Sequence, residues 1–102
     1  MTDILNIDVS ELEDIMLLEE TSAGNKAELI VYNDDFNTFD WVIQCFMEVC
    51  NHTFEQSEQL SLIVHYKGKA IVKTGAFKKL KPMKEALVER GLSAVIEVMV
   101  EE

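Results

Sequence analysis

Asn33, Asp34 and Asp35 place one amide and two carboxylates side by side, between an apolar run and a helical pattern. Adjacent carboxylates repel each other, so this segment is expected either to cap a helix or to bind a positive group. Asp and Asn before a helix are most often caps, because their oxygens accept hydrogen bonds from the first backbone N–H groups and suit the helix dipole. From these three residues alone, both interpretations stay open.

His65 is a further candidate for the same site. It lies near the end of a second helical pattern, in the run LIVHYKGKA. A short connection separates this helix from the one after the NDD segment, and helices joined in this way favour antiparallel packing. Such packing would place His65 beside Asn33 and the two aspartates. A single histidine at a helix end is most often structural, so this alternative also stays open.

The chemistry of such a cluster would be that of hydrogen-bond acceptors. Carboxylate and amide oxygens, with one nitrogen of a neutral imidazole, suit a compact group with several donors, such as a primary ammonium. An ammonium about 4 Å from a partly screened carboxylate gains on the order of 4 kcal/mol before desolvation is subtracted. Apolar residues are expected around the same junction: Val31, Phe39, Val42, Val64 and Leu92. Burial of one large apolar side chain there would add roughly 1.5–3 kcal/mol. An α-amine with a hydrophobic side chain one carbon away is the N-terminus of a peptide.

Composition indicates one modest domain and an uneven charge distribution. The chain has 102 residues and a net charge of −10, which argues against nucleic acid as the main partner. Residues 1–25 contain seven acidic and no basic residues, whereas residues 67–90 contain eight of the nine bases and only two acids. Each charged stretch is interpreted either as a solvated surface or as a docking surface for a protein partner.

The chain is expected to be cytoplasmic. No apolar run approaches the roughly 20 residues needed to cross a bilayer, and the N-terminal residues are acidic where a signal peptide would be basic. Cys45 and Cys50 are five residues apart in a helical pattern and point to different faces. We therefore expect two reduced, buried thiols. The sequence has no CxxC pair that would indicate a zinc or redox site.

The small-residue run TSAGNK is interpreted as a boundary between a flexible acidic N-terminal extension, residues 1–26, and a domain of residues 27–102. Within the extension, SELEDIMLLEE could form a short amphipathic helix with Ser10 as its cap and Glu13 completing a capping box. Such a helix is too short to be stable alone.

The domain is predicted to be α+β, with the order β-α-α-β-α-β and helices packed on one face of a small antiparallel three-stranded sheet. The predicted strands are residues 27–33, 69–75 and 93–100, and the second is expected to end at a turn glycine. A first helix over 38–51 would be capped by Thr38, and a second would begin with a Thr53–Gln56 capping box and stop at Gly68. A third helix is predicted over 80–91, with Pro82 in its first turn and Gly91 just past its end.

NDDFNTFDWV, followed later by QLSLIVHYKGKA, resembles the ClpS family, adaptors of the bacterial ATP-dependent Clp protease. The resemblance covers residues 27–100. It implies a non-enzymatic protein without a cofactor, which binds N-degron substrates beginning with Leu, Phe, Tyr or Trp. Family members deliver these substrates to a ClpA- or ClpC-type AAA+ unfoldase for degradation by ClpP. Neither nucleic acid nor a membrane is an expected partner.

The resemblance also implies roles for individual residues. Asn33, Asp35 and His65 match the residues that bind the α-amino group, and Asp34 adds negative potential and a second contact. The hydrophobic pocket is matched by Val31, Phe39, Val42, Ser61, Val64 and Leu92. The third helix, around Lys81 and Lys84, matches the surface that docks on the N-terminal domain of the unfoldase. The extension of residues 1–26 matches a family segment that is thought to engage the unfoldase during delivery.

Two positions depart from the family pattern. Phe39 stands where many members have a methionine that excludes β-branched side chains, and Ser61 stands where a methionine is frequent. A larger residue at one position and a smaller one at the other could offset each other in volume, so the ranking among Leu, Phe, Tyr and Trp is left open. Substrates beginning with Ile or Val are still expected to be rejected.

Two other function classes are weighed against the adaptor. Metal-assisted hydrolysis could use Asp34, Asp35 and His65, but His52 is the only other histidine and neither a nucleophile signature nor a glycine-rich phosphate loop is present. We therefore expect no metal site. The other class is a general protein-interaction domain with a fold like that of the ribosomal stalk protein's C-terminal domain. It would not bind peptide N-termini, and its partner binding would not depend on Asp35 or His65.

Overall fold

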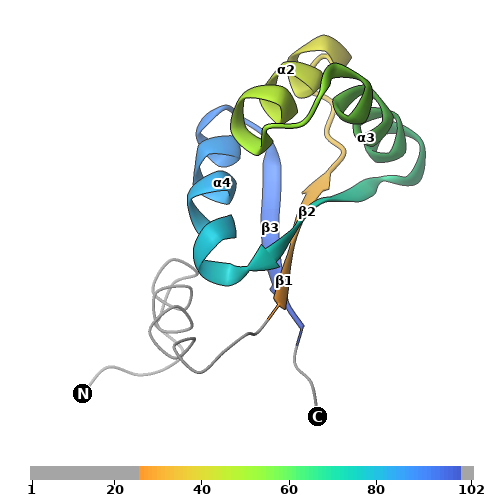
Figure 1. Cartoon of the computed structure of the whole chain (residues 1–102). Helices are drawn as coiled ribbons and strands as arrows, with labels where there is room; N and C mark the ends of the chain where they lie inside the picture. Colours follow the sequence, from red (N-terminus) through yellow and green to blue (C-terminus); the bar gives the residue numbers. More distant parts are fainter. Residues whose placement is uncertain (1–25, 100–102) are drawn as a thin grey trace.

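The structure is a computed structural model and describes residues 26–99. Its elements are, in order, β1 (Lys26–Tyr32), α2 (Phe39–Cys50), α3 (Phe54–Lys67), β2 (Lys69–Ala76), α4 (Phe77–Glu89) and β3 (Ser93–Val98) (Figure 1). The predicted β-α-α-β-α-β order and the α+β class are confirmed. Apart from Lys26, with which β1 begins, the predicted extension and the helix expected within it lie outside the described residues.

β1 is the central strand of a three-stranded antiparallel sheet with the order β2-β1-β3. Its apolar and β-branched sequence suits a strand that pairs with a neighbour along each of its edges. Leu29, Ile30 and Val31 are all buried. β2 and β3 form the edges of the sheet, and burial in β2 alternates more clearly, with Val72 buried and Ile71 half exposed.

The helices pack on one face of the sheet. Alternate residues of a strand point to the same face, and Leu29 and Val31 of β1 belong to one core cluster with Phe46 of α2, Val64 of α3 and Leu87 of α4. Figure 1 shows α2 and α3 next to each other at one end of the sheet, while α4 runs along it. The junction of α2 and α3 with the sheet therefore lies at one end of the domain.

The predicted caps of α2 and α3 are confirmed. The Thr38 hydroxyl accepts a hydrogen bond from the Trp41 backbone N–H at 3.1 Å, and Thr53 and Gln56 form both bonds of a capping box. α3 ends at Gly68, which has a φ of 91°. This left-handed conformation is strained for residues with a Cβ and natural for glycine, so the end of α3 is fixed by its sequence.

The predicted start of the third helix is wrong. α4 begins at Phe77 instead of residue 80, and β2 runs directly into it. Gly75 is not a turn residue, because it pairs with Ala27 inside the sheet. The early start is explained by burial: Phe77 is 2% exposed and packs in the core. Pro82 consequently lies inside the helix, where it lacks the N–H that an interior position would use.

Both cysteines are free and buried, as predicted. Burial raises the pKa of the Cys50 thiol to about 11, against a smaller opposing effect of the Lys73 charge. Cys50 is therefore protonated at neutral pH, and its thiol packs in the core as a small apolar group.

The described helices are short. α3, with 14 residues, is about 21 Å long at 1.5 Å per residue. Within residues 26–99, no helix has the length and apolar character required to span a membrane.

Candidate functional site

One backbone hydrogen bond places the NDD segment against the end of α3. The Asn33 N–H donates to the Gly68 carbonyl at 2.9 Å, directly after the last pair of the β1–β2 ladder, Tyr32 with Lys69. The loop that follows β1 is thereby held next to the last turn of α3, which contains His65. The structure thus brings together the two segments that the sequence analysis singled out.

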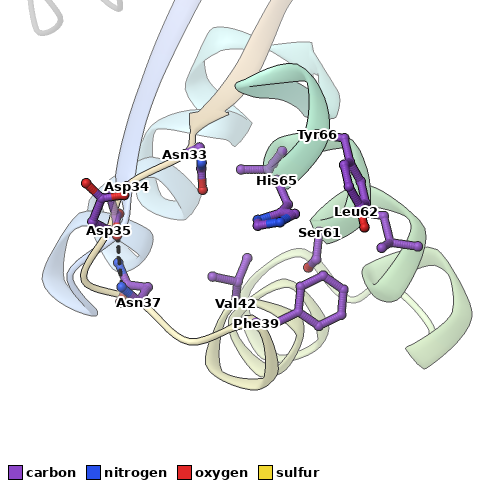
Figure 2. A pocket seen from close by; sticks show the side chains of 11 residues that line it. Asn33, Asp34, Asp35, Asn37, Phe39, Val42, Ser61, Leu62, His65 and Tyr66 are labelled. Carbon is purple, nitrogen blue, oxygen red and sulfur yellow. Dashed lines mark hydrogen bonds between the residues drawn. The ribbon is translucent and has the colours of Figure 1, made fainter.

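A cavity of about 560 Å³ lies between this loop, α2 and α3. It is lined by four residues of the loop, two of α2 and five of α3: Asn33, Asp34, Asp35, Asn37, Phe39, Val42, Ser61, Leu62, Val64, His65 and Tyr66. Figure 2 shows the loop residues at one side, with Val42, Phe39 and Ser61 at the other and His65 between them. The cavity therefore has a polar and a largely apolar part, and a volume within the usual range of small-ligand sites.

The side chains of Asn33, Asp35 and His65 have no hydrogen-bond or ion-pair partner among residues 26–99. The His65 ring makes an edge contact with the ring of Tyr66, with centroids 4.8 Å apart. In Figure 2 the side chains of Asn33 and His65 extend toward the same space. An amide oxygen, a carboxylate and an imidazole are thus available to a ligand in this cavity.

Asp34 differs from its neighbours because its carboxylate is used within the loop. It accepts hydrogen bonds from the backbone N–H groups of Phe36 and Asn37, both at 2.9 Å, and from the Asn37 side-chain amide at 2.8 Å. Partial burial raises the pKa of Asp34, but these bonds outweigh it and leave the pKa below the ordinary aspartate value. Asp34 holds the loop in shape and adds a negative charge to the wall of the cavity.

Asn37 is a positioning residue that the sequence analysis missed. Its side-chain amide donates both to Asp34 and to the Gly91 carbonyl, at 2.9 Å, in the turn between α4 and β3. This bond joins the loop to a segment 54 residues further along the chain. The spacing Asp34-x-x-Asn37 is a local signal for a side chain–backbone turn, but the contact with Gly91 has no signature in the sequence. Leu62 and Tyr66, which also line the cavity, were missed as well.

The predicted pocket residues fall into two groups. Phe39, Val42, Ser61 and Val64 line the cavity, and Phe39, at the start of α2, is 38% exposed. The other two, Val31 and Leu92, are buried and do not line it. They border a much smaller adjoining cavity of about 20 Å³, which shares Val42 and Val64 with the larger one.

The two predicted docking lysines lie away from the cavity. Lys81 and Lys84 are three residues apart in α4, on one side of the helix, and both are partly buried. α4 contributes no residue to the lining of the cavity. A protein bound to α4 and a ligand in the cavity would therefore occupy different surfaces of the domain.

The possible metal ligands among the described residues are not clustered. In the part of the chain that the structure describes, no group of three or more His, Cys, Asp and Glu side chains is arranged to hold one. The second histidine, His52, uses its Nε2 in a 2.6 Å hydrogen bond with the Val72 carbonyl, outside this cavity. The acceptors of the cavity fit a donor-rich ligand instead.

Comparisons with known proteins decide the family. The family model described as "ATP-dependent Clp protease adaptor protein ClpS" matches residues 23–95. The chain belongs to the ClpS family. It is therefore a Clp protease adaptor and not an enzyme, as the resemblance of its motifs predicted.

Two ClpS adapters illustrate how close the relationship is. The chain is 40% identical to the ClpS adapter of Thermosynechococcus vestitus over 67 residues, which cover 65% of this chain and 71% of that protein. Its identity to the ClpS adapter of Erwinia tasmaniensis is 36% over 65 residues, 64% of this chain and 61% of that protein. The match to the Erwinia protein thus spans less than two thirds of its length.

A solved structure has the same fold. Agrobacterium tumefaciens ClpS2, determined with bound L-phenylalaninamide, superposes with a TM-score of 0.62 over 74% of this chain and 98% of that one. The two sequences are 20% identical. This similarity confirms the adaptor fold of the domain.

Proposed function

We propose that this adaptor binds the free N-terminus of N-degron substrates that begin with Leu, Phe, Tyr or Trp. It would deliver them to a ClpA- or ClpC-type AAA+ unfoldase for degradation by ClpP, in the cytoplasm. The observation that supports this proposal is that one cavity contains three side chains whose hydrogen-bond acceptors are unused within the described residues. Asn33, Asp35 and His65 are all potential acceptors, and none is used by the rest of the described domain.

The α-ammonium group would be bound by these three side chains. The Asn33 amide oxygen and one His65 ring nitrogen would each accept one N–H, and the Asp35 carboxylate would accept the third and supply the opposite charge. Asp34, whose oxygens already accept three hydrogen bonds, would contribute through its charge alone. The second contact that the resemblance implied for Asp34 is therefore not part of this proposal.

The first side chain of the substrate would enter the apolar part of the cavity, between α2 and α3. Val42 and Val64 form its wall, and Phe39 lies at its edge. Val31 and Leu92 would support this wall from behind, since they border the small adjoining cavity. In the structure of Agrobacterium tumefaciens ClpS2 the ligand is L-phenylalaninamide, which combines a free α-amine with an aromatic side chain. The same chemistry is proposed here.

The unfoldase would dock on α4 through the surface around Lys81 and Lys84. Because α4 does not line the cavity, substrate and unfoldase could be bound at the same time, as delivery requires. The acidic N-terminal extension, residues 1–26, would be the segment that the unfoldase engages.

Isothermal titration with two peptides tests the proposal. A peptide that begins with Leu should bind with a dissociation constant near micromolar, about −8 kcal/mol, and the same peptide with an acetylated amine should not bind. Acetylation removes the charge and most of the donors while leaving the side chain unchanged. A general protein-interaction domain would bind neither peptide, and equal affinity for both would contradict the proposal.

A further inference from the structure

Two buried serine hydroxyls of α3 have no hydrogen-bond partner among residues 26–99: those of Ser57 and Ser61. Ser57 is 0% exposed and Ser61 is 2% exposed. A buried hydroxyl without a partner costs folding free energy, and native structures rarely contain one without a reason. The two residues lie about one helical turn apart on the buried side of α3.

The two serines differ in one respect. Ser61 lines the 560 Å³ cavity, whereas Ser57 lines neither this cavity nor the smaller one adjoining it. Ser61 adds a polar side-chain atom beside the apolar lining residues Phe39, Val42 and Val64, apart from the polar side chains of the loop, of His65 and of Tyr66. A ligand in the cavity could therefore give Ser61 the partner that it lacks.

We propose that the Ser61 hydroxyl is a specificity-determining group, which makes the cavity prefer an N-terminal tyrosine over an N-terminal phenylalanine. This inference rests on the proposed function, because it assumes that the first side chain of a substrate enters this cavity. The tyrosine phenol would donate a hydrogen bond to Ser61 Oγ. Phenylalanine would fill the same space and leave the hydroxyl unpaired.

The position of Ser61 on α3 fits this role. It precedes His65 by four residues, so it lies on the same face of the helix, about 6 Å along the axis from the proposed amine-binding residue. This separation is comparable to the length of a tyrosine side chain. A tyrosine whose amine is bound at His65 could therefore direct its phenol toward Ser61, as the arrangement of both residues around the cavity in Figure 2 suggests.

A small movement is needed for this contact. The Oγ atom itself has almost no exposed surface in the empty cavity. Serine has a single side-chain torsion with three staggered positions, and no hydrogen bond holds Ser61 in its present one. Rotation about its Cα–Cβ bond would turn the hydroxyl toward a phenol without moving the helix.

Titration of two peptides that differ only in their first residue, Tyr or Phe, tests the inference. One net hydrogen bond corresponds to about fivefold in affinity, so the Tyr peptide should bind about fivefold tighter. Ser61→Ala should remove this preference, so that the Tyr and Phe peptides bind the variant with equal affinity. Ser57→Ala is the matched control, because it removes an equally buried and unpaired hydroxyl that does not line the cavity. It should retain the fivefold preference.

The possible outcomes separate this inference from the proposed function. Equal affinities for the two peptides, or a Tyr preference that persists in Ser61→Ala, would overturn the inference while peptide binding itself stands. If neither peptide bound, the proposed function would fail and the inference with it. Thermal unfolding of both variants serves as a check, since loss of an unpaired buried hydroxyl should leave the midpoint unchanged or raise it.

Discussion

The two ends of α3 each border a cavity that contains a histidine and a carboxylate, but the two cavities differ in what their polar groups are doing. The C-terminal half of α3 borders the 560 Å³ cavity with His65 and Asp35. The N-terminal half borders a cavity of about 430 Å³ with His52 and Glu55. By residue type and size alone, either could be chosen as the site.

The His52 and Gln56 side chains of the N-terminal cavity already form hydrogen bonds within the fold. His52 bonds to the Val72 carbonyl, and the Gln56 side chain accepts from the Thr53 backbone N–H at 3.0 Å in the capping box. Glu55 lies in the first turn of α3, where its charge complements the helix dipole. In the C-terminal cavity, Asn33, Asp35 and His65 have no such partners within the described part of the chain. The availability of a polar group indicates a binding site better than its type.

The largest effect on binding is expected from Asp35. Asp35→Asn removes the proposed charge partner of the ammonium and should weaken binding of a Leu-initiated peptide about 100-fold, since hydrogen bonds to charged groups are the strong ones. Glu55→Gln is the matched control in the other cavity and should leave the dissociation constant unchanged. Isothermal titration measures both. Equal losses of peptide affinity in the two variants would contradict the assignment of the binding site to the C-terminal cavity.

The two histidines should give opposite results. His65→Ala should weaken peptide binding about tenfold, through loss of one acceptor, with little change in stability. His52→Ala should leave binding unchanged and lower the free energy of unfolding by about 1 kcal/mol, because it removes the hydrogen bond to Val72. Peptide titration and urea unfolding of each variant check the pair. A stability loss in His65→Ala without a binding loss would assign His65 to the fold.

Asp34 is expected to stabilise the folded protein rather than to contact the peptide directly. Asp34→Asn weakens the bonds to the Asn37 and Phe36 backbones and should lower the free energy of unfolding by about 1 kcal/mol at neutral pH. Because the folded-state pKa of Asp34 is lowered, its contribution is complete above the ordinary aspartate pKa and disappears as the pH falls through the folded value. The difference between the wild type and the variant should therefore shrink in acid. A difference that grew with falling pH would show the pKa shift to have the opposite sign.

Local sequence rules were sufficient for much of the fold. Thr38, the Thr53–Gln56 box and Gly68 each specify a helix end through contacts within a few residues, and all were correct. The prediction failed where a contact between residues far apart in the sequence determined the structure. Gly75 suggested a turn, but pairing with Ala27 in the sheet extended β2 past it and α4 began three residues early.

The same contrast between local and long-range contacts applies to the site. The sequence indicated which residues would meet, because helix ends and a short connection determine their neighbourhood. It did not show which of the two adjacent aspartates is used by the loop, since this depends on how Asn37 is held by Gly91, 54 residues away. Whether Val31 and Leu92 line the cavity or lie behind it is also a matter of packing depth, which a pattern of apolar residues does not give.

Mapping of backbone amide shifts by NMR is the most direct test of which cavity binds a peptide N-terminus. On titration of the ¹⁵N-labelled full chain with a Leu-initiated peptide, the largest shift changes should fall on residues 33–39 and 61–66, and residues 52–59 should change little. The acetylated peptide should cause none of these changes. Shifts concentrated around His52 and Val72, or the same shifts with and without the acetyl group, would contradict the account.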